Sequence, residues 1–181
     1  MSFKIPQWLV LGLAAVSTAA SAQAGVLLSL DEALALVFPA AEVRRQPVFL
    51  SEAQREEVRR LAGSPLPSGL VVRYEAFRNG ELQGTAYTDT HRVRTLSATL
   101  LVVLHPAGSV MRVEVLSFDE PLEYLPRREW YGQLAGRRLD GELALKRGVR
   151  PVAGATLTAA ATVDAVRRVL ALHAVLGAGG R

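Results

Sequence analysis

Four strand-like segments in the middle of the chain limit its fold more than any other feature. These segments are 70–77, which is rich in Val, Tyr and Phe, and 81–88, 95–104 and 109–118, the last of which alternates in polarity. Asn79-Gly80, between the first two, is a strong signal for a two-residue hairpin. Pro106-Ala107-Gly108 supplies a turn between the last two. The pattern predicts a twisted antiparallel sheet of about four strands.

Helical patterns flank this predicted sheet. Residues 30–38 are rich in apolar side chains and stop at Pro39, and Ser51-Glu52-Ala53-Gln54 is a capping box that opens a charged helix ending near Gly63. We therefore expect residues 25–68 to form an N-terminal helical segment. After the sheet, residues 125–134 predict another helix. Strands followed by helices indicate an α+β domain, a twisted antiparallel sheet with packed helices.

The last helical pattern begins with small residues and a threonine. Apolar residues recur from Val163 to Leu176 with a period that predicts an amphipathic helix of roughly five turns. A helix N-terminus presents unpaired N–H groups and partial positive charge, which suit a phosphate. Gly154 leaves room for a close approach, and Thr156 offers a hydroxyl. From spacing alone, a simpler interpretation is favoured, in which Thr156 or Thr158 caps the helix.

Gly154-Ala155-Thr156-Leu157-Thr158, placed before an Ala-rich helix, resembles the attachment motif of the FMN-binding domain family. That family includes the extracytoplasmic flavin subunits of the Rnf and Nqr electron-transport complexes. The resemblance covers about residues 69–176 and implies that FMN is joined by a phosphoester bond to Thr156. A dedicated flavin transferase makes this bond after export. The chain departs from the family pattern at Ala153, where Ser or Thr is usual, and at Arg150, where an acidic residue is common.

The same resemblance extends to a second group of residues. Asp89, His91 and Arg94 follow the spacing of a run found in exported relatives, and the stretch Glu120 to Tyr124 is also similar. The implied cofactor-binding residues are Gly154, Ala155, Thr156, Leu157, Thr158, His91, Arg94 and Tyr124. From the residues alone, His91 is a hydrogen-bonded structural residue or a wall of the flavin site. Tyr124 and Trp130 either stack on the flavin ring or pack in the core.

Taken together, these observations predict an exported FMN-binding electron-transfer protein with membrane or periplasmic redox partners. It would be an electron carrier rather than an enzyme with its own substrate, and we assign no catalytic or metal-binding residue. The alternative is an envelope binding or scaffold module that keeps the fold without covalent flavin. A further option is non-covalent FMN with Arg150 near the phosphate.

Charge argues against nucleic acid as a partner. The chain has 21 Lys and Arg against 17 Asp and Glu, for a formal net charge of +4. Its arginines occur in pairs mixed with acidic residues, whereas nucleic-acid binding favours clustered basic residues with interleaved aromatics.

The N-terminus has the pattern of a secretory signal. Lys4 precedes an apolar run over residues 8–16, and small residues then form two A-x-A cleavage patterns. We predict a signal peptide over residues 1–24, the FMN-binding domain over 69–176 and a flexible tail over 177–181. The protein would be periplasmic or extracytoplasmic. The alternatives are cleavage after Ala22 and an uncleaved membrane anchor, since residues 5–30 carry no charge and are long enough to span a bilayer.

Cleavage after Ala24 predicts that the native protein begins at Gly25. Intact mass spectrometry of protein purified from its own envelope tests this directly. A mass that includes Met1 would reject cleavage and favour the anchor, and a mass two residues greater than expected would move the cut to Ala22.

Overall fold

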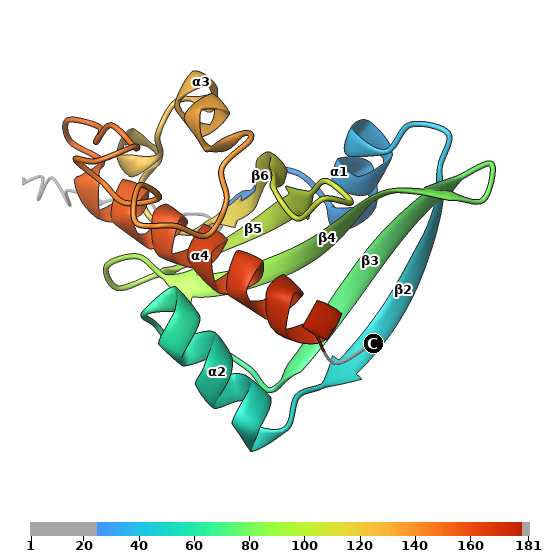
Figure 1. Ribbon diagram of the computed structural model, residues 1–181. Coiled ribbons are helices and arrows are strands. Elements are labelled where there is room, and N and C mark those ends of the chain that lie inside the picture. The colour runs from blue at the N-terminus through green and yellow to red at the C-terminus, as the bar shows by residue number, and fades with distance from the viewer. Residues whose placement is uncertain (1–24, 179–181) are drawn as a thin grey trace, which may run out of the picture.

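The computed structural model describes residues 25–178, and within them a six-stranded antiparallel sheet forms the centre of the protein (Figure 1). The spatial order of the strands is β1-β6-β5-β4-β3-β2. The strands are β1 (Gly25–Val26), β2 (Glu42–Phe49), β3 (Leu70–Arg78), β4 (Glu81–Arg92), β5 (Ser97–Leu104) and β6 (Val110–Phe118). The sheet and its helices confirm the predicted α+β class.

Helices lie on both faces of this sheet. They are α1 (Leu30–Val37), α2 (Glu52–Ala62), α3 (Arg128–Tyr131) and α4 (Thr156–Ala178), with short 3₁₀ helices η1 (Leu122–Tyr124) and η2 (Gly132–Leu134). Helix α4 crosses one face and packs beside α2, whereas α1 covers part of the other face (Figure 1).

The alternation of side chains along β5 builds two hydrophobic cores. Leu100 and Val102 pack in the core shared with α4 and α2, whereas Leu101 and Val103 pack in the core shared with α1. All four side chains are buried. A strand covered on both faces has an unbroken apolar sequence, as residues 100–104 do.

The predicted helix starts agree closely with the structure. The Ser51 side chain accepts a hydrogen bond from the Gln54 N–H, and the Gln54 side chain accepts one from the Ser51 N–H, which completes the capping box. Ser29 and Glu32 form a second capping box at α1. Gly63 ends α2 with a positive φ of 81°, the left-handed conformation that glycine adopts without strain.

Two expectations about secondary structure are wrong. Residues 25–68 are not helical throughout, because Glu42–Phe49 is a strand that pairs along its whole length with β3. This strand lacks a clear alternation of polar and apolar side chains because four consecutive residues, Arg44 to Pro47, are polar or proline. These residues are tolerated because β2 lies at the edge of the sheet. The helix expected over 125–134 is reduced to one turn at Arg128–Tyr131 followed by η2.

Gly84 determines how closely α1 approaches the sheet. A Cβ atom at this position would lie 2.7 Å from the Leu104 carbonyl oxygen and 2.9 Å from Cε1 of Phe38. The first contact is with backbone, which has no alternative rotamer. Gly84 therefore allows the Phe38 ring to lie directly against β4.

Gly84→Ala is accordingly expected to lower the free energy of unfolding by about 1–3 kcal/mol, as overpacking of a core does. Urea unfolding followed by circular dichroism measures the loss. Gly132→Ala is the matched control, because a Cβ atom there meets nothing within 4 Å. Equal stability of the two variants would show that α1 shifts freely.

Candidate functional site

Thr156 is the first residue of α4, and its hydroxyl does not cap the helix. The hydroxyl donates a hydrogen bond to the Val152 carbonyl oxygen at 3.0 Å, whereas an N-cap hydroxyl accepts one from a backbone N–H. The first helical carbonyl in use is that of Ala155, which accepts from the Ala159 N–H at 2.9 Å. Ala155 is therefore the capping residue, and the interpretation of Thr156 as the cap is wrong.

The start of α4 separates the motif into exposed and buried residues. Gly154, Thr156 and Leu157 are exposed, whereas Ala155 and Thr158 are buried. Gly154 has a φ of 79°, and a Cβ atom on it would meet nothing within 4 Å. The glycine is thus required for its backbone conformation, and the space beside it is open. Of the two motif threonines, only Thr156 is reachable from solvent.

The loop before the motif is fixed by α3 and η2. The Trp130 indole N–H donates to the Arg150 carbonyl oxygen at 2.7 Å, and the Arg150 N–H donates to the Gln133 side-chain oxygen at 2.8 Å. These bonds hold the Arg150 backbone on both sides. They also explain why Trp130 lies half-buried here, with its polar edge satisfied by a protein carbonyl.

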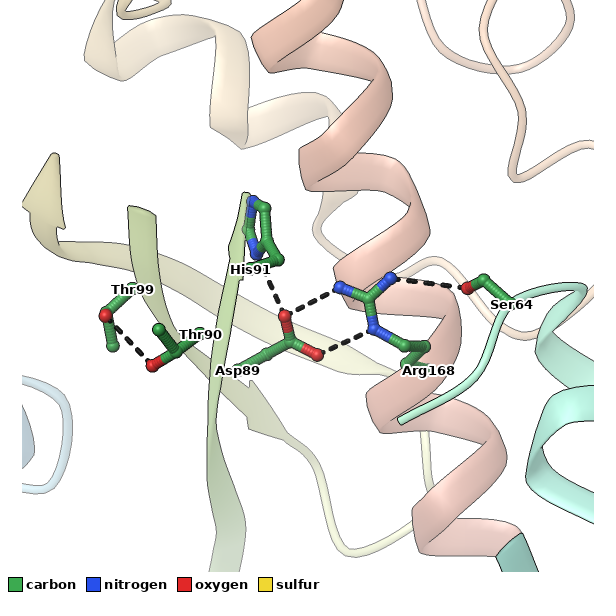
Figure 2. Close-up of polar contacts among 6 residues, drawn as sticks. All are labelled: Ser64, Asp89, Thr90, His91, Thr99 and Arg168. Atoms are coloured by element: carbon green, nitrogen blue, oxygen red, sulfur yellow. Dashed lines mark hydrogen bonds and ion pairs between the residues drawn. The ribbon is translucent and has the colours of Figure 1, made fainter. Parts of the chain in front are cut away.

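A second cluster of polar residues joins β4 to α4 (Figure 2). Arg168 donates two hydrogen bonds to the Asp89 carboxylate. Its Nε donates to Oδ2 at 2.9 Å, and a terminal guanidinium nitrogen donates to Oδ1 at 2.7 Å. His91 Nδ1 lies 2.9 Å from the same Oδ1 atom. Arg168 also donates to the Ser64 hydroxyl at 3.3 Å, which brings in the segment after α2. Asp89 and Arg168 are both buried.

Electrostatics keeps the Asp89 carboxyl group charged. Burial alone would raise its pKa, but the hydrogen bonds from His91 and Arg168 outweigh burial and lower the pKa below its ordinary value. The pair is therefore a true ion pair. Sequence reasoning noticed Asp89 but not Arg168. The adjacent charges Arg167 and Arg168 interrupt the apolar residues from Val166 to Leu172, and a charge on a buried helix face signals that a partner exists.

A third group holds the turn between β4 and β5. The Glu120 side chain accepts hydrogen bonds from the backbone N–H groups of Arg94, Thr95 and Leu96, at 3.2, 2.8 and 2.9 Å. These donors lower the pKa of the Glu120 carboxyl group. The Arg94 guanidinium lies over the Tyr124 ring, 4.3 Å from its centroid. One face of the ring is thereby occupied.

The residues implied by the family resemblance thus form separate groups of contacts instead of one site. Arg94 meets Tyr124, and His91 meets Asp89. Across the described residues, no hydrogen bond or ion pair connects these side chains to Thr156. In α4, His173 Nδ1 lies 3.1 Å from the Tyr87 hydroxyl oxygen, which is a further contact between this helix and β4.

Residues 25–178 hold no group of three or more His, Asp or Glu side chains that could bind a metal ion. No helix in this range is long and apolar enough to cross a membrane. The predicted signal over residues 1–24 lies outside the described residues.

Comparison with known proteins returns no match: no family model, no curated protein and no solved structure is similar to this chain.

Removing the Asp89 charge should be costly, because it leaves a buried guanidinium without its partner. We expect Asp89→Asn to lower the free energy of unfolding by about 3–5 kcal/mol. Asp164→Asn, an exposed change on α4, is the control and should cost less than about 0.5 kcal/mol. A carboxyl group with a lowered folded-state pKa stabilises above its unfolded pKa, near 3.9, and loses that contribution as pH falls through the folded value. The gap between wild type and Asp89→Asn should therefore narrow in acid, and a gap independent of pH would contradict the ion pair.

Proposed function

We propose that this protein is an exported FMN-binding electron-transfer protein in which FMN is linked to Thr156 through a phosphoester bond. The observation that supports the proposal most directly is the exposed Thr156 hydroxyl at the first residue of a 23-residue helix. The resemblance of the surrounding motif to the attachment site of the FMN-binding domain family supplies the identity of the group. When bound, FMN supplies one- and two-electron transfer.

The start of α4 suits a phosphate for two physical reasons. The N–H groups of the first helical residues, Thr156 to Thr158, have no carbonyl partner inside the helix. The aligned peptide dipoles add a partial positive charge at this end. Exposed Gly154 has no side chain to block the approach, and the exposed Arg150 guanidinium belongs to the same loop. The single negative charge that a phosphodiester keeps, shared by its two non-bridging oxygens, would therefore be stabilised here.

Formation of the ester requires an activated donor, which a flavin dinucleotide provides. The Thr156 oxygen would form the new bond to the phosphorus of the FMN unit, and the bond from that phosphorus to the leaving nucleotide would break with its electron pair. The hydroxyl proton passes to a base of the flavin transferase. Before the attack, Val152 holds this proton through its carbonyl oxygen and so fixes the orientation of the hydroxyl.

A second candidate function follows from the two departures in the motif. Ala153 and Arg150 stand where the transferase would meet a hydroxyl and an acidic side chain in the family pattern. Both residues are exposed, so a transferase would contact them directly. If they prevent recognition, the domain is an envelope binding or scaffold module, or it holds FMN without a covalent bond.

Coexpression with an exported flavin transferase tests the covalent bond. After denaturing electrophoresis, the wild-type band should fluoresce as flavin, Thr156→Ala should be dark, and Thr156→Ser should retain fluorescence because it keeps a hydroxyl in the same place. Thr158→Val should also stay fluorescent, since that buried threonine is not accessible. The transferase is shown to be active on a known substrate in parallel.

Other outcomes separate the candidates. A dark wild-type band with active transferase excludes covalent attachment. Flavin that then comes off on denaturation of the native protein indicates non-covalent binding, whereas a colourless native protein favours the scaffold module. A fluorescent Thr156→Ala band would place the ester on another residue.

A further inference from the structure

An open pocket of about 410 Å³ lies between the turn that joins β5 to β6 and the last turns of α4. Its walls come from three segments: the turn at residues 106–108, residues 138–139 of the later loop, and the part of α4 that carries Leu170, His173 and Ala174. The volume falls within the range of about 300–1,000 Å³ that is usual for small-molecule sites. We call it the β5–β6 turn pocket.

Tyr87 of β4 holds His173 in the wall of this pocket. The Nδ1 atom of His173 lies 3.1 Å from the Tyr87 hydroxyl oxygen, and the two rings form a T-shaped pair. The opposite edge of the imidazole faces the turn, because a Cβ atom on Gly108 would lie 3.8 Å from Cδ2 of His173. Nε2 is bonded to Cδ2, so this second nitrogen lies on the pocket side of the ring.

The Tyr87 hydroxyl is the donor in this contact. Burial raises the pKa of Tyr87 well above its ordinary value, so the hydroxyl keeps its proton at neutral pH. Among the described residues, His173 Nδ1 is the acceptor within hydrogen-bonding distance of that proton. Arg73 lies opposite Tyr87 in the register of β3 and β4, but a guanidinium cannot accept a hydrogen bond.

This contact determines where His173 carries its own proton. Partial burial lowers the pKa of His173, and the charge of Arg73 lowers it further and outweighs the opposite effect of Glu75. The ring is therefore neutral at pH 7 and has one N–H group. Because Nδ1 accepts from Tyr87, that N–H group is at Nε2, and it is a donor on the pocket side.

Arg138 brings a positive charge to the same pocket. Its side chain is exposed, and one terminal nitrogen donates to the Ala107 carbonyl oxygen at 2.8 Å, which fixes the guanidinium beside the turn. That bond uses one of the five N–H donors of a guanidinium. Arg138 and His173 are the polar side chains of the described lining, and neither accepts a hydrogen bond in this state.

We propose that the β5–β6 turn pocket binds a small carboxylate with an apolar body. The carboxylate accepts hydrogen bonds from Arg138 and from Nε2 of His173, and a planar guanidinium matches a carboxylate in shape and charge. The described lining contains no acidic side chain that would repel the ligand. The last carbonyl groups of α4 carry partial negative charge, which turns the carboxylate toward Arg138. Leu139, Leu170 and Ala174 contact the apolar body.

This pocket is separate from the proposed FMN attachment. His173 lies seventeen residues after Thr156 in α4, which is about 25 Å along a helix. The carboxylate-binding proposal therefore does not depend on whether Thr156 carries FMN.

Cinnamate, a planar carboxylate with a phenyl ring, is the probe for the mature chain. Its size predicts a Kd of about 1 mM. Nitrogen-edited NMR titration should shift the amide signals of Gly108, Leu139 and Ala174 above all others. The neutral isostere cinnamamide should bind at least about tenfold more weakly, because the charge-assisted hydrogen bonds are lost.

A second NMR measurement tests the donor. A correlation between the ring nitrogens and ring protons of His173 should show Nε2 protonated and Nδ1 unprotonated before ligand is added, and the Nε2 signal should move on cinnamate binding. A ring that carries its proton on Nδ1 would overturn the assignment of His173 as a donor.

Two matched arginine variants locate the charge. Arg138→Gln should weaken cinnamate binding about tenfold or more. Arg147→Gln is the control, because Arg147 is also exposed and also donates to a backbone carbonyl, that of Gly141, but does not line the pocket. Its binding should be unchanged. Absence of binding, equal affinity for cinnamamide, shifts confined to another region, or equal weakening by both variants would overturn the proposal.

Discussion

The buried ion pair between Asp89 and Arg168 connects the parts of this protein that a sheet and a helix alone would leave free to slide. Arg168 joins α4 to β4 through two hydrogen bonds, and its third contact reaches Ser64 after α2. A buried ion pair contributes little net stability compared with an apolar pair of similar volume. It does fix one arrangement of α4 on β4, because any shift of the helix would leave a buried charge unpaired. Together with the hydrogen bonds from Arg167 to three backbone carbonyls, this contact fixes the rotation of α4, and with it the direction of Thr156.

The structure also shows which parts of the fold could be predicted from the sequence. Strong local signals succeeded: the Asn79-Gly80 hairpin, the capping box at Ser51 and the central alternating strands are all present. Strand β2 was missed because its side chains at an exposed edge need not alternate in polarity. The register that brings Asp89 to Arg168 joins residues 79 positions apart, and no local pattern encodes such a contact.

The candidate site around Thr156 also combines features that the sequence predicts with features that only the structure shows. Thr156 is exposed and Thr158 is buried because the two residues point in different directions from α4. The motif alone does not reveal these directions. Arg94 and Tyr124 were selected by resemblance to a family. In the structure they stack on each other beside Glu120, so a local contact accounts for both residues.

The two outer strands of the sheet have a consequence for the order of folding. Gly25 of β1 pairs with Phe118 of β6, so the first described residue waits for a partner 93 positions later in the chain. Closing so long a loop is slow, and contacts of this kind form late. The face of the sheet that α4 covers waits longer still, because that helix begins only at Thr156. A chain with this connectivity cannot complete its sheet until residue 118 has been made.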